Sequence, residues 1–374
     1  MSISQHKQEV KNPVEKWKKH KMESLVMSER MMQHPSLKAR AARMKYCGDV
    51  IGAQKCPVCG KIHLKGGHMC HDRLCPLCQW RLSATRFAQM IRCLDVLGDR
   101  LTKEDATIGM LTLTLRNVPV YKLRDTIEKM SAAWKIMRQR KMFGELVLGA
   151  ARSVEITYNA ESNSYHPHLH IFLVTRPFTD EMRADLTDFI VRQQNKVREH
   201  RIKELKNKQL EIPEKLKIPI IAPKFKDDKF LLTEYGRCSW QKALGIWYRP
   251  QVQYKYAYTK GGRDAAVSSY ECISWSENKR QAALSAAREC AKYVVGIKAL
   301  AAIPDADLYR FATEINGVQM VSYSGILRDA RKALNFKTEK ISDENGEGKC
   351  TSCGADVVNY LLVWSGGYYK EVDL

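Results

Sequence analysis

The alternation of apolar and polar residues along the chain predicts a series of β-strands. Alternation at every second position places successive side chains on opposite faces of a strand. This pattern covers 108–115, 152–158, 165–174, 251–258 and 318–323, and 357–364 is also strand-like. Helical spacing of apolar residues predicts helices at 13–32, 36–46, 79–97, 121–143, 180–203 and 277–301. The pattern favours an α+β protein with a central antiparallel sheet flanked by helices.

Two of the predicted strands form a hairpin. The polar segment 159–164 separates the strands 152–158 and 165–174 and is typical of a turn. If the turn is symmetric, Glu155 lies directly opposite His168 on the paired strand. A shift of one residue in the register would move Glu155 to the other face of the sheet.

Three histidines occupy alternate positions in the second strand of this hairpin. His166, His168 and His170 would therefore point to the same face. With Glu155 opposite, His168 and His170 are the predicted ligands of a divalent metal, and Mg²⁺ or Mn²⁺ suits an open His/His/Glu site beside a phosphate. His166, beside Pro167 at the start of the strand, is expected to lie next to these ligands or to contact the substrate.

A cysteine-rich segment begins at Cys47 and predicts a zinc module. Two Cys-x-x-Cys pairs, separated by fifteen residues, match the spacing of a structural zinc site. The predicted ligands are Cys56, Cys59, Cys75 and Cys78, and Cys70 either replaces Cys59 or pairs with Cys47 or His71 in a second site. Further candidates to complete a site are Cys47, His63 and His71.

A third Cys-x-x-Cys pair, Cys350 and Cys353, lies near the end of the sequence. One pair fills only half of a tetrahedral site. It therefore needs Cys47, Cys70, another cysteine or a second chain; otherwise the two residues are free thiols.

Composition points to a polyanionic partner. The 374 residues include 62 Lys and Arg against 41 Asp and Glu, a net charge of +21, and such an excess favours nucleic acid. No apolar run is long enough to span a bilayer and the first forty residues are polar, so we expect no membrane partner and a cytoplasmic location. In that reducing compartment the 12 cysteines are expected to be thiols or metal ligands.

The shifts in composition suggest four regions. Residues 1–46 form a basic helical arm, either on DNA or simply solvated, and 47–98 form the zinc module and its following helix. Residues 99–301 form the main domain, with a Lys-rich insertion at about 200–232 that is either a DNA contact or a solvated loop. Residues 302–374 form a C-terminal region that carries Cys350 and Cys353.

Several motifs, taken in order, resemble those of one enzyme family. The segment 168–170 (His-Leu-His) resembles the His-hydrophobe-His (HUH) motif of metal-dependent DNA-nicking enzymes. Within that superfamily, the segments 111–114, 165–170 and 289–293 are similar to three motifs of the rolling-circle replication initiators (Rep) of small plasmids. The segment 70–81 resembles the cysteine block before those motifs, and 240–252 is also similar.

This resemblance implies an HUH nuclease fold and a mechanism. Tyr293 would attack a phosphate of origin DNA, single-stranded or extruded, and would remain attached to the 5′-phosphate while a 3′-OH is released to prime synthesis. Glu289, one helical turn earlier, would activate water for a second cleavage that ends the round. The chain would thus be a site-specific single-strand endonuclease and strand transferase. Host helicase, DNA polymerase and single-strand-binding protein are partners implied by the resemblance alone.

Two other interpretations fit part of the sequence. A transposase or a mobilisation relaxase of the same superfamily would use the same chemistry, although the glutamate before Tyr293 favours replication. A zinc-containing DNA-binding regulator without catalytic activity would explain the charge and the cysteines. It would leave the histidine face and Tyr293 without a role.

Overall fold

The computed structural model describes residues 13–221, 223–257, 277–292, 295–336, 349–350 and 353–373. Tyr293 therefore lies outside the described residues. The chain divides into two compact units. The first unit combines residues 1–85, 304–312 and 338–374, and the second combines 86–303 and 313–337. Of the C-terminal region 302–374 that composition suggested, residues 304–312 and 338–374 thus share a unit with the cysteine-rich segment, and 313–337 belong to the second unit.

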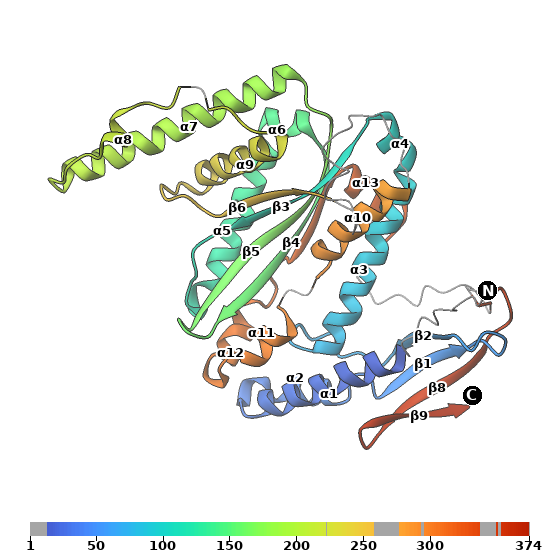
Figure 1. The fold of residues 1–374 in the computed structure, drawn as a ribbon. Coiled ribbons are helices and arrows are strands. Elements are labelled where there is room, and N and C mark those ends of the chain that lie inside the picture. Colours follow the sequence, from blue (N-terminus) through green and yellow to red (C-terminus); the bar gives the residue numbers. More distant parts are fainter. Residues whose placement is uncertain are drawn as a thin grey trace, which may run out of the picture. The chain divides into compact units, whose positions relative to one another are not determined.

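The second unit contains a five-stranded sheet in the order β6-β3-β5-β4-β7, with every pair of neighbours antiparallel. Its strands are β3 (Thr107–Thr114), β4 (Val147–Asn159), β5 (Ser164–Thr175), β6 (Val252–Tyr256) and β7 (Val321–Gly325). The helices α10 (Glu277–Cys290) and α13 (Ile326–Ala333) cover one face, and α5 (Leu123–Arg138) and α9 (Asp228–Leu244) cover the other (Figure 1). The predicted α+β class, with a central antiparallel sheet flanked by helices, is confirmed.

Each face of this sheet has its own apolar core. On the α10 face, Met110, Phe172 and Val174 pack against Ala283 and Ala287 in one buried cluster. The small alanines let the helix backbone approach the strands closely, which explains why an Ala-rich helix lies on this face.

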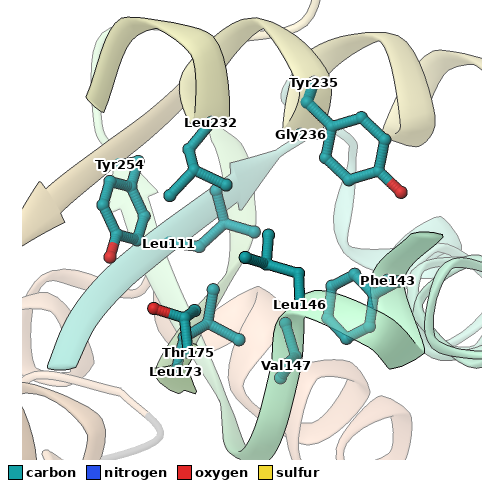
Figure 2. Close-up of a pocket in the computed structure, with 10 residues that line it drawn as sticks. All are labelled: Leu111, Phe143, Leu146, Val147, Leu173, Thr175, Leu232, Tyr235, Gly236 and Tyr254. Carbon is teal, nitrogen blue, oxygen red and sulfur yellow. The ribbon is translucent and has the colours of Figure 1, made fainter. Parts of the chain in front are cut away.

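The opposite face holds a small apolar pocket between α9, α6 (Lys141–Leu146) and the strands (Figure 2). Leu111, Leu173, Leu232 and Phe143 contribute to its wall. Its volume of about 10 Å³ is close to the space that one water molecule needs, so the pocket is a packing gap within the core.

The remaining helices of the second unit connect these elements. They are α4 (Gly98–Lys103), α7 (Asp180–Asn207), α8 (Glu214–Lys217), α11 (Ile297–Ala302) and the 3₁₀ turn Val120–Lys122. The Lys-rich insertion expected at about 200–232 is partly helical: α7 continues through its first residues and α9 begins within it, where Asp227 caps the helix by accepting a bond from Phe230 N.

The first unit contains a four-stranded antiparallel sheet in the order β2-β1-β8-β9. Its strands are β1 (Val50–Lys55), β2 (Ile62–Gly67), β8 (Val358–Ser365) and β9 (Tyr368–Asp373). Its helices are α1 (Pro13–Met32), α2 (Lys38–Lys45) and the 3₁₀ turn Pro35–Leu37; α3 (Pro76–Val96) begins in this unit, and α12 (Asp305–Glu314) lies mostly within it.

A buried lysine fixes the chain where α2 leads into β1. The ammonium group of Lys21 is fully buried and donates to Lys45 O at 2.6 Å and Cys47 O at 3.0 Å. It also pairs with Asp49 Oδ1 at 2.5 Å. The ammonium group thus satisfies backbone carbonyl groups at and just after the end of α2. The carboxylate of Asp49 balances the buried positive charge.

No helix among the described residues has the length and apolar character needed to cross a bilayer.

Candidate metal centre and cysteine groups

The register of the β4–β5 hairpin places three functional side chains together. Glu155 pairs directly with His168, as the symmetric turn predicted, and Ser153 pairs with His170. Glu155, His168 and His170 offer ligand atoms that all lie within 4.8 Å of one another. The site is therefore a product of strand pairing alone, because one shift in register would separate the carboxylate from both imidazoles.

One carboxylate oxygen lies between the two imidazoles. Glu155 Oε2 is 3.1 Å from His168 Nε2 and 2.7 Å from His170 Nε2. Two imidazole nitrogens and a carboxylate oxygen are a donor set that suits a divalent ion, with coordination positions left for water or a phosphate oxygen. The residues therefore fit the metal that the sequence predicted.

The other nitrogen of each imidazole has its own partner. His168 Nδ1 lies 3.4 Å from His166 O, and His170 Nδ1 lies 3.4 Å from Thr112 Oγ1 on β3. A proton on Nδ1 that bonds to such an oxygen leaves Nε2 free to bind a metal, and it also fixes the orientation of the ring. The neighbouring strand thus supports the ligand arrangement.

Electrostatics keep Glu155 ionised. Burial favours the neutral carboxyl group, but the hydrogen bonds and the charges of His168 and His170 outweigh it. The pKa of Glu155 is therefore well below its ordinary value, and the carboxylate is available as a ligand at neutral pH.

His166 lies on the same face, with its ring centroid 5.6 Å from that of His168. Burial, and then the charge of His168, lower the pKa of His166 below its ordinary value. Its Nε2 atom is buried and has no hydrogen-bond partner among the described residues. His166 is thus beside the ligand group but outside it.

Helix α10 brings a second carboxylate to the same face. Glu289 Oε1 is 3.9 Å from His170 Nε2 and 2.5 Å from Lys292 Nζ. The next residue, Cys290, is buried against the sheet, with its thiol 3.4 Å from Ala151 O. Farther along, Val295 forms a parallel bridge with Ile156, the neighbour of Glu155. The residues on both sides of position 293 therefore contact the strands that carry the histidine group.

The first unit holds a buried group of four cysteines: Cys47, Cys70, Cys75 and Cys78. The Sγ atoms of Cys47 and Cys78 are 3.5 Å apart, and both Cys70–Cys78 and Cys75–Cys47 are 3.6 Å apart. Burial opposes ionisation of Cys75, but hydrogen bonds with the neighbouring thiols and Ser24 outweigh it and lower its pKa well below the ordinary value. Four sulfur atoms at this spacing suit a zinc ion, to which each cysteine would bind as a thiolate.

A second group in the same unit joins Cys56 and Cys59 to Cys350 and Cys353. Sγ distances across it are 3.4 Å for Cys56–Cys353 and 3.6 Å for Cys59–Cys350. The third Cys-x-x-Cys pair of the sequence thus finds its other half in the first pair.

This grouping corrects the single site predicted from Cys56, Cys59, Cys75 and Cys78. Cys47 precedes β1 and Cys70 follows β2, whereas Cys56 and Cys59 lie at the turn between these strands. A six-residue strand is about 20 Å long, so the two ends of the hairpin are too far apart for one tetrahedral shell. The sequence held a signal for the right pairing, because the first and third pairs are each followed directly by glycine.

Comparison with known proteins finds a family match in the same region. Residues 61–182 match the family described as "Replication protein". This stretch includes β3, β4 and β5 and therefore Glu155, His168 and His170. This segment is therefore similar to the domain that defines that family.

Relatives of this domain are named as replication proteins too. A "Protein rep" of Streptococcus pneumoniae is 28% identical over 43% of this chain and 49% of its own length, and one of a Bacillus species is 32% identical over 38% and 45%. A "Protein rep" of Lactiplantibacillus plantarum is 26% identical over 82% of this chain and 78% of its own length. The matched part of the chain thus spans about half the length of the first two relatives. No solved structure matches.

These matches support the resemblance to rolling-circle plasmid replication initiators that the sequence motifs indicated. The matched segment contains the histidine group, and the two cysteine groups could hold zinc.

Proposed function

We propose that the chain initiates plasmid replication by nicking one strand at the double-strand origin. The observation that carries this proposal is the cluster of Glu155, His168 and His170, with Glu289 beside His170. The relatives' names favour replication over the transposase or relaxase that the sequence also allowed. The net charge of +21 suits a DNA partner, and such a reaction would take place in the cytoplasm, where plasmids are copied.

In this proposal Glu155, His168 and His170 hold Mg²⁺ or Mn²⁺. The bound ion would polarise a phosphoryl oxygen of the scissile phosphate. The Tyr293 side chain would attack the phosphorus, and the bond from phosphorus to the 3′ oxygen would break. The products are a 5′-phosphotyrosyl link and a free 3′-OH, which receives a proton and can prime synthesis.

Glu289 would serve a second reaction at the same centre. It is about one-third exposed, and its carboxylate is held by Lys292 and lies near His170. A carboxylate in this position can accept a proton from water, and that water could cleave a second phosphodiester without a second tyrosine. Such a cleavage would end a round of replication.

The buried group of Cys47, Cys70, Cys75 and Cys78 would hold a structural zinc ion. Its members lie between the end of α2 and the first turn of α3 in sequence, and three of the four are buried. Four cysteines would fill a tetrahedral shell and leave no open position of the kind that catalytic zinc needs. The ion would contribute folding free energy to the first unit.

A nicking assay tests the tyrosine. The full chain is incubated with Mn²⁺ and a supercoiled plasmid that carries the DNA flanking its own coding sequence. The wild type should relax the plasmid and remain attached to a 5′ end, whereas Tyr293→Phe should lose attachment by on the order of 10³-fold or more. The exposed Tyr121→Phe is the matched control and should behave as wild type. Equal attachment by Tyr293→Phe would remove Tyr293 from the proposed mechanism.

A second assay tests Glu289. Glu289→Gln keeps the shape of the side chain but cannot accept a proton, so the first cleavage should stay within about tenfold of wild type while the second falls by about 10²-fold. Glu128→Gln, an exposed residue on α5, is the control. The assay uses a substrate with two nick sites and counts released circles. Normal release by Glu289→Gln would show that another group activates the water.

A further inference from the structure

The described residues of the first and third Cys-x-x-Cys-Gly segments share hydrogen bonds and the conformation of the glycine. In one, Gly60 N donates to Cys56 O at 2.9 Å, and in the other, Gly354 N donates to Cys350 O at 2.8 Å. Both glycines have positive φ, +68° and +73°. No heavy atom lies within 4 Å of a Cβ at either position, so the backbone conformation, and not lack of space, requires glycine there.

Both segments also close with the same second hydrogen bond. Cys56 N donates to Lys61 O at 2.9 Å, and Cys350 N donates to Ala355 O at 2.7 Å. The same two hydrogen bonds thus join the residues that flank each pair of cysteines, although the two segments are separated by most of the sequence. The same hydrogen bonds and the same Cys-x-x-Cys-Gly sequence suggest that the two segments bind the same kind of ligand.

The four thiols of these turns interleave. Cys56 Sγ approaches Cys353 Sγ at 3.4 Å, and Cys59 Sγ approaches Cys350 Sγ at 3.6 Å, so each turn contacts the other through both of its cysteines. Four sulfurs at about 2.3 Å from a central zinc ion in tetrahedral geometry would be about 3.8 Å apart. The observed spacing is close to that value.

Other uses of four cysteines fit less well. Two disulfides would need sulfur pairs at about 2.05 Å and would leave no reason for all four thiols to converge within 4.8 Å. Free thiols would gain little from convergence. Cys59 and Cys353 are exposed while Cys56 and Cys350 are buried, so the group lies at the surface and an ion can enter it.

A histidine borders this group. His63 Nε2 is 3.7 Å from Cys350 Sγ, and an N–H at this position can donate to a thiolate. A zinc ion with four thiolate ligands has a net charge of −2. A hydrogen-bond donor beside one sulfur stabilises this negative charge. No comparable contact from a histidine side chain to the buried cysteine group is present among the described residues.

We propose that Cys56, Cys59, Cys350 and Cys353 bind a second zinc ion, which fastens the C-terminal strands to the N-terminal hairpin. Lys55 pairs with Val358 in the sheet, and the cysteines lie just beyond this end of the strands. The ion would thus lock the register of β1 and β8, two strands whose pairing closes a very long loop. Closing such a loop carries an entropic cost that a strong local link offsets.

Zinc counting on the purified, reduced full chain tests this proposal. Elemental mass spectrometry measures the amount of zinc per mole of chain, and the wild type should hold two zinc ions. Cys350→Ser/Cys353→Ser and Cys56→Ser/Cys59→Ser should each hold one. Cys93→Ser, which removes a buried thiol outside both groups, should still hold two. A wild type with one ion, or paired variants that keep two, would overturn the proposal.

Alkylation of the wild type gives a test that needs no variant. Cys59 and Cys353 are exposed, and as free thiols they would react with N-ethylmaleimide at once. In the zinc-loaded chain all four cysteines should react at least tenfold more slowly, and a chelator should remove this protection. Fast labelling before chelation would contradict the second zinc site. Protection that only a reductant removes would assign disulfides instead.

The paired variants should also change the sheet. Backbone amides of β8 should exchange hydrogen faster in Cys350→Ser/Cys353→Ser than in Cys93→Ser, while those of β5 should keep the wild-type rate. Unchanged exchange in β8 together with a lost zinc ion would overturn the role of the ion as a link between the strands.

Discussion

The histidine group and the second group of cysteines (Cys56, Cys59, Cys350 and Cys353, here the cysteine group) are both candidate metal centres, but they are assembled in opposite ways. Glu155, His168 and His170 come from one hairpin, and fifteen residues separate Glu155 from His170. Cys56 and Cys353 are 297 residues apart. The first group follows from local strand pairing, whereas the second exists only because the two ends of the chain join one sheet.

The two groups also differ in what holds them without an ion. Glu155 already lies between two imidazoles in hydrogen-bonding distance, so the hairpin has contacts of its own. The sulfur atoms of the cysteine group contact one another, His63 Nε2 and the backbone N–H of Cys59, and hydrogen bonds of sulfur are weak. We therefore expect the histidine group to keep its arrangement without a metal, and the cysteine group to depend on the proposed zinc ion.

The largest expected effect concerns the histidine group. His170→Ala should lower metal-dependent nicking by on the order of 10²-fold or more, because even residues that only support a metal ligand change activity by about 10–100-fold. Thermal stability should fall by about 1–3 kcal/mol as well, because the imidazole is buried and pairs with Glu155, so cleavage is compared at a temperature where the variant is folded. Single-turnover cleavage of a single-stranded oligonucleotide with Mn²⁺ measures it.

His200→Ala is the matched control for that variant. His200 stacks on Trp247 with ring centroids 4.0 Å apart and lies outside the ligand group. The His200→Ala variant should cleave DNA at the wild-type rate. If both variants lose cleavage equally, or if His170→Ala unfolds, the histidine group is not the independent centre that the comparison describes.

Metal removal should have the next largest effect, and it should act on the sheet of the first unit but not on that of the second. After chelation, amides of β1 and β8 should exchange hydrogen more than about tenfold faster, because structural zinc contributes on the order of 10 kcal/mol in small zinc domains. Amides of β4 and β5 should keep their rates, since Glu155 still bonds both histidines. Segment-resolved hydrogen exchange measures both. Equal loosening of the two sheets would break the comparison.

Low pH should remove the protection of β4 and β5 that remains after chelation. The pKa of Glu155 in the folded chain lies below its ordinary value of 4.5, so the unfolded state binds more protons as pH falls through that value. The contribution of Glu155 to stability is present above about pH 4.5 and is lost below it. The chelated wild type should therefore lose protection of β4 and β5 in acid to a greater extent than chelated Glu155→Gln.

The smallest effect concerns the turns of the cysteine group. Gly354→Ala should destabilise the first unit by about 1–2 kcal/mol, because φ of +73° strains any residue with a Cβ. Gly144→Ala, in helix α6 with nothing within 4 Å of the added methyl, should be neutral or stabilising by about 0.5–1 kcal/mol. Thermal unfolding compares the two. Equal effects would show that the turn does not constrain the cysteines.

The sequence alone determined the local features of this chain. Alternation fixed most strands, and the polar turn at 159–164 fixed the register that sets Glu155 opposite His168. Helical spacing gave α1 with its observed bounds, Pro13–Met32, and a helix at the position of α5. These features depend on contacts between residues that are near in sequence, where periodicity and turn chemistry are sufficient.

Only the tertiary structure decided which distant residues meet. It placed β8 beside β1 and thereby divided the cysteines into two groups, and it brought Glu289 within 3.9 Å of His170. Spacing shows that a cysteine pair needs partners but cannot identify them, since any pair can complete another in a tetrahedral shell. The choice follows from the length of the β1–β2 hairpin, which holds its two ends apart, and from the packing of the whole first unit.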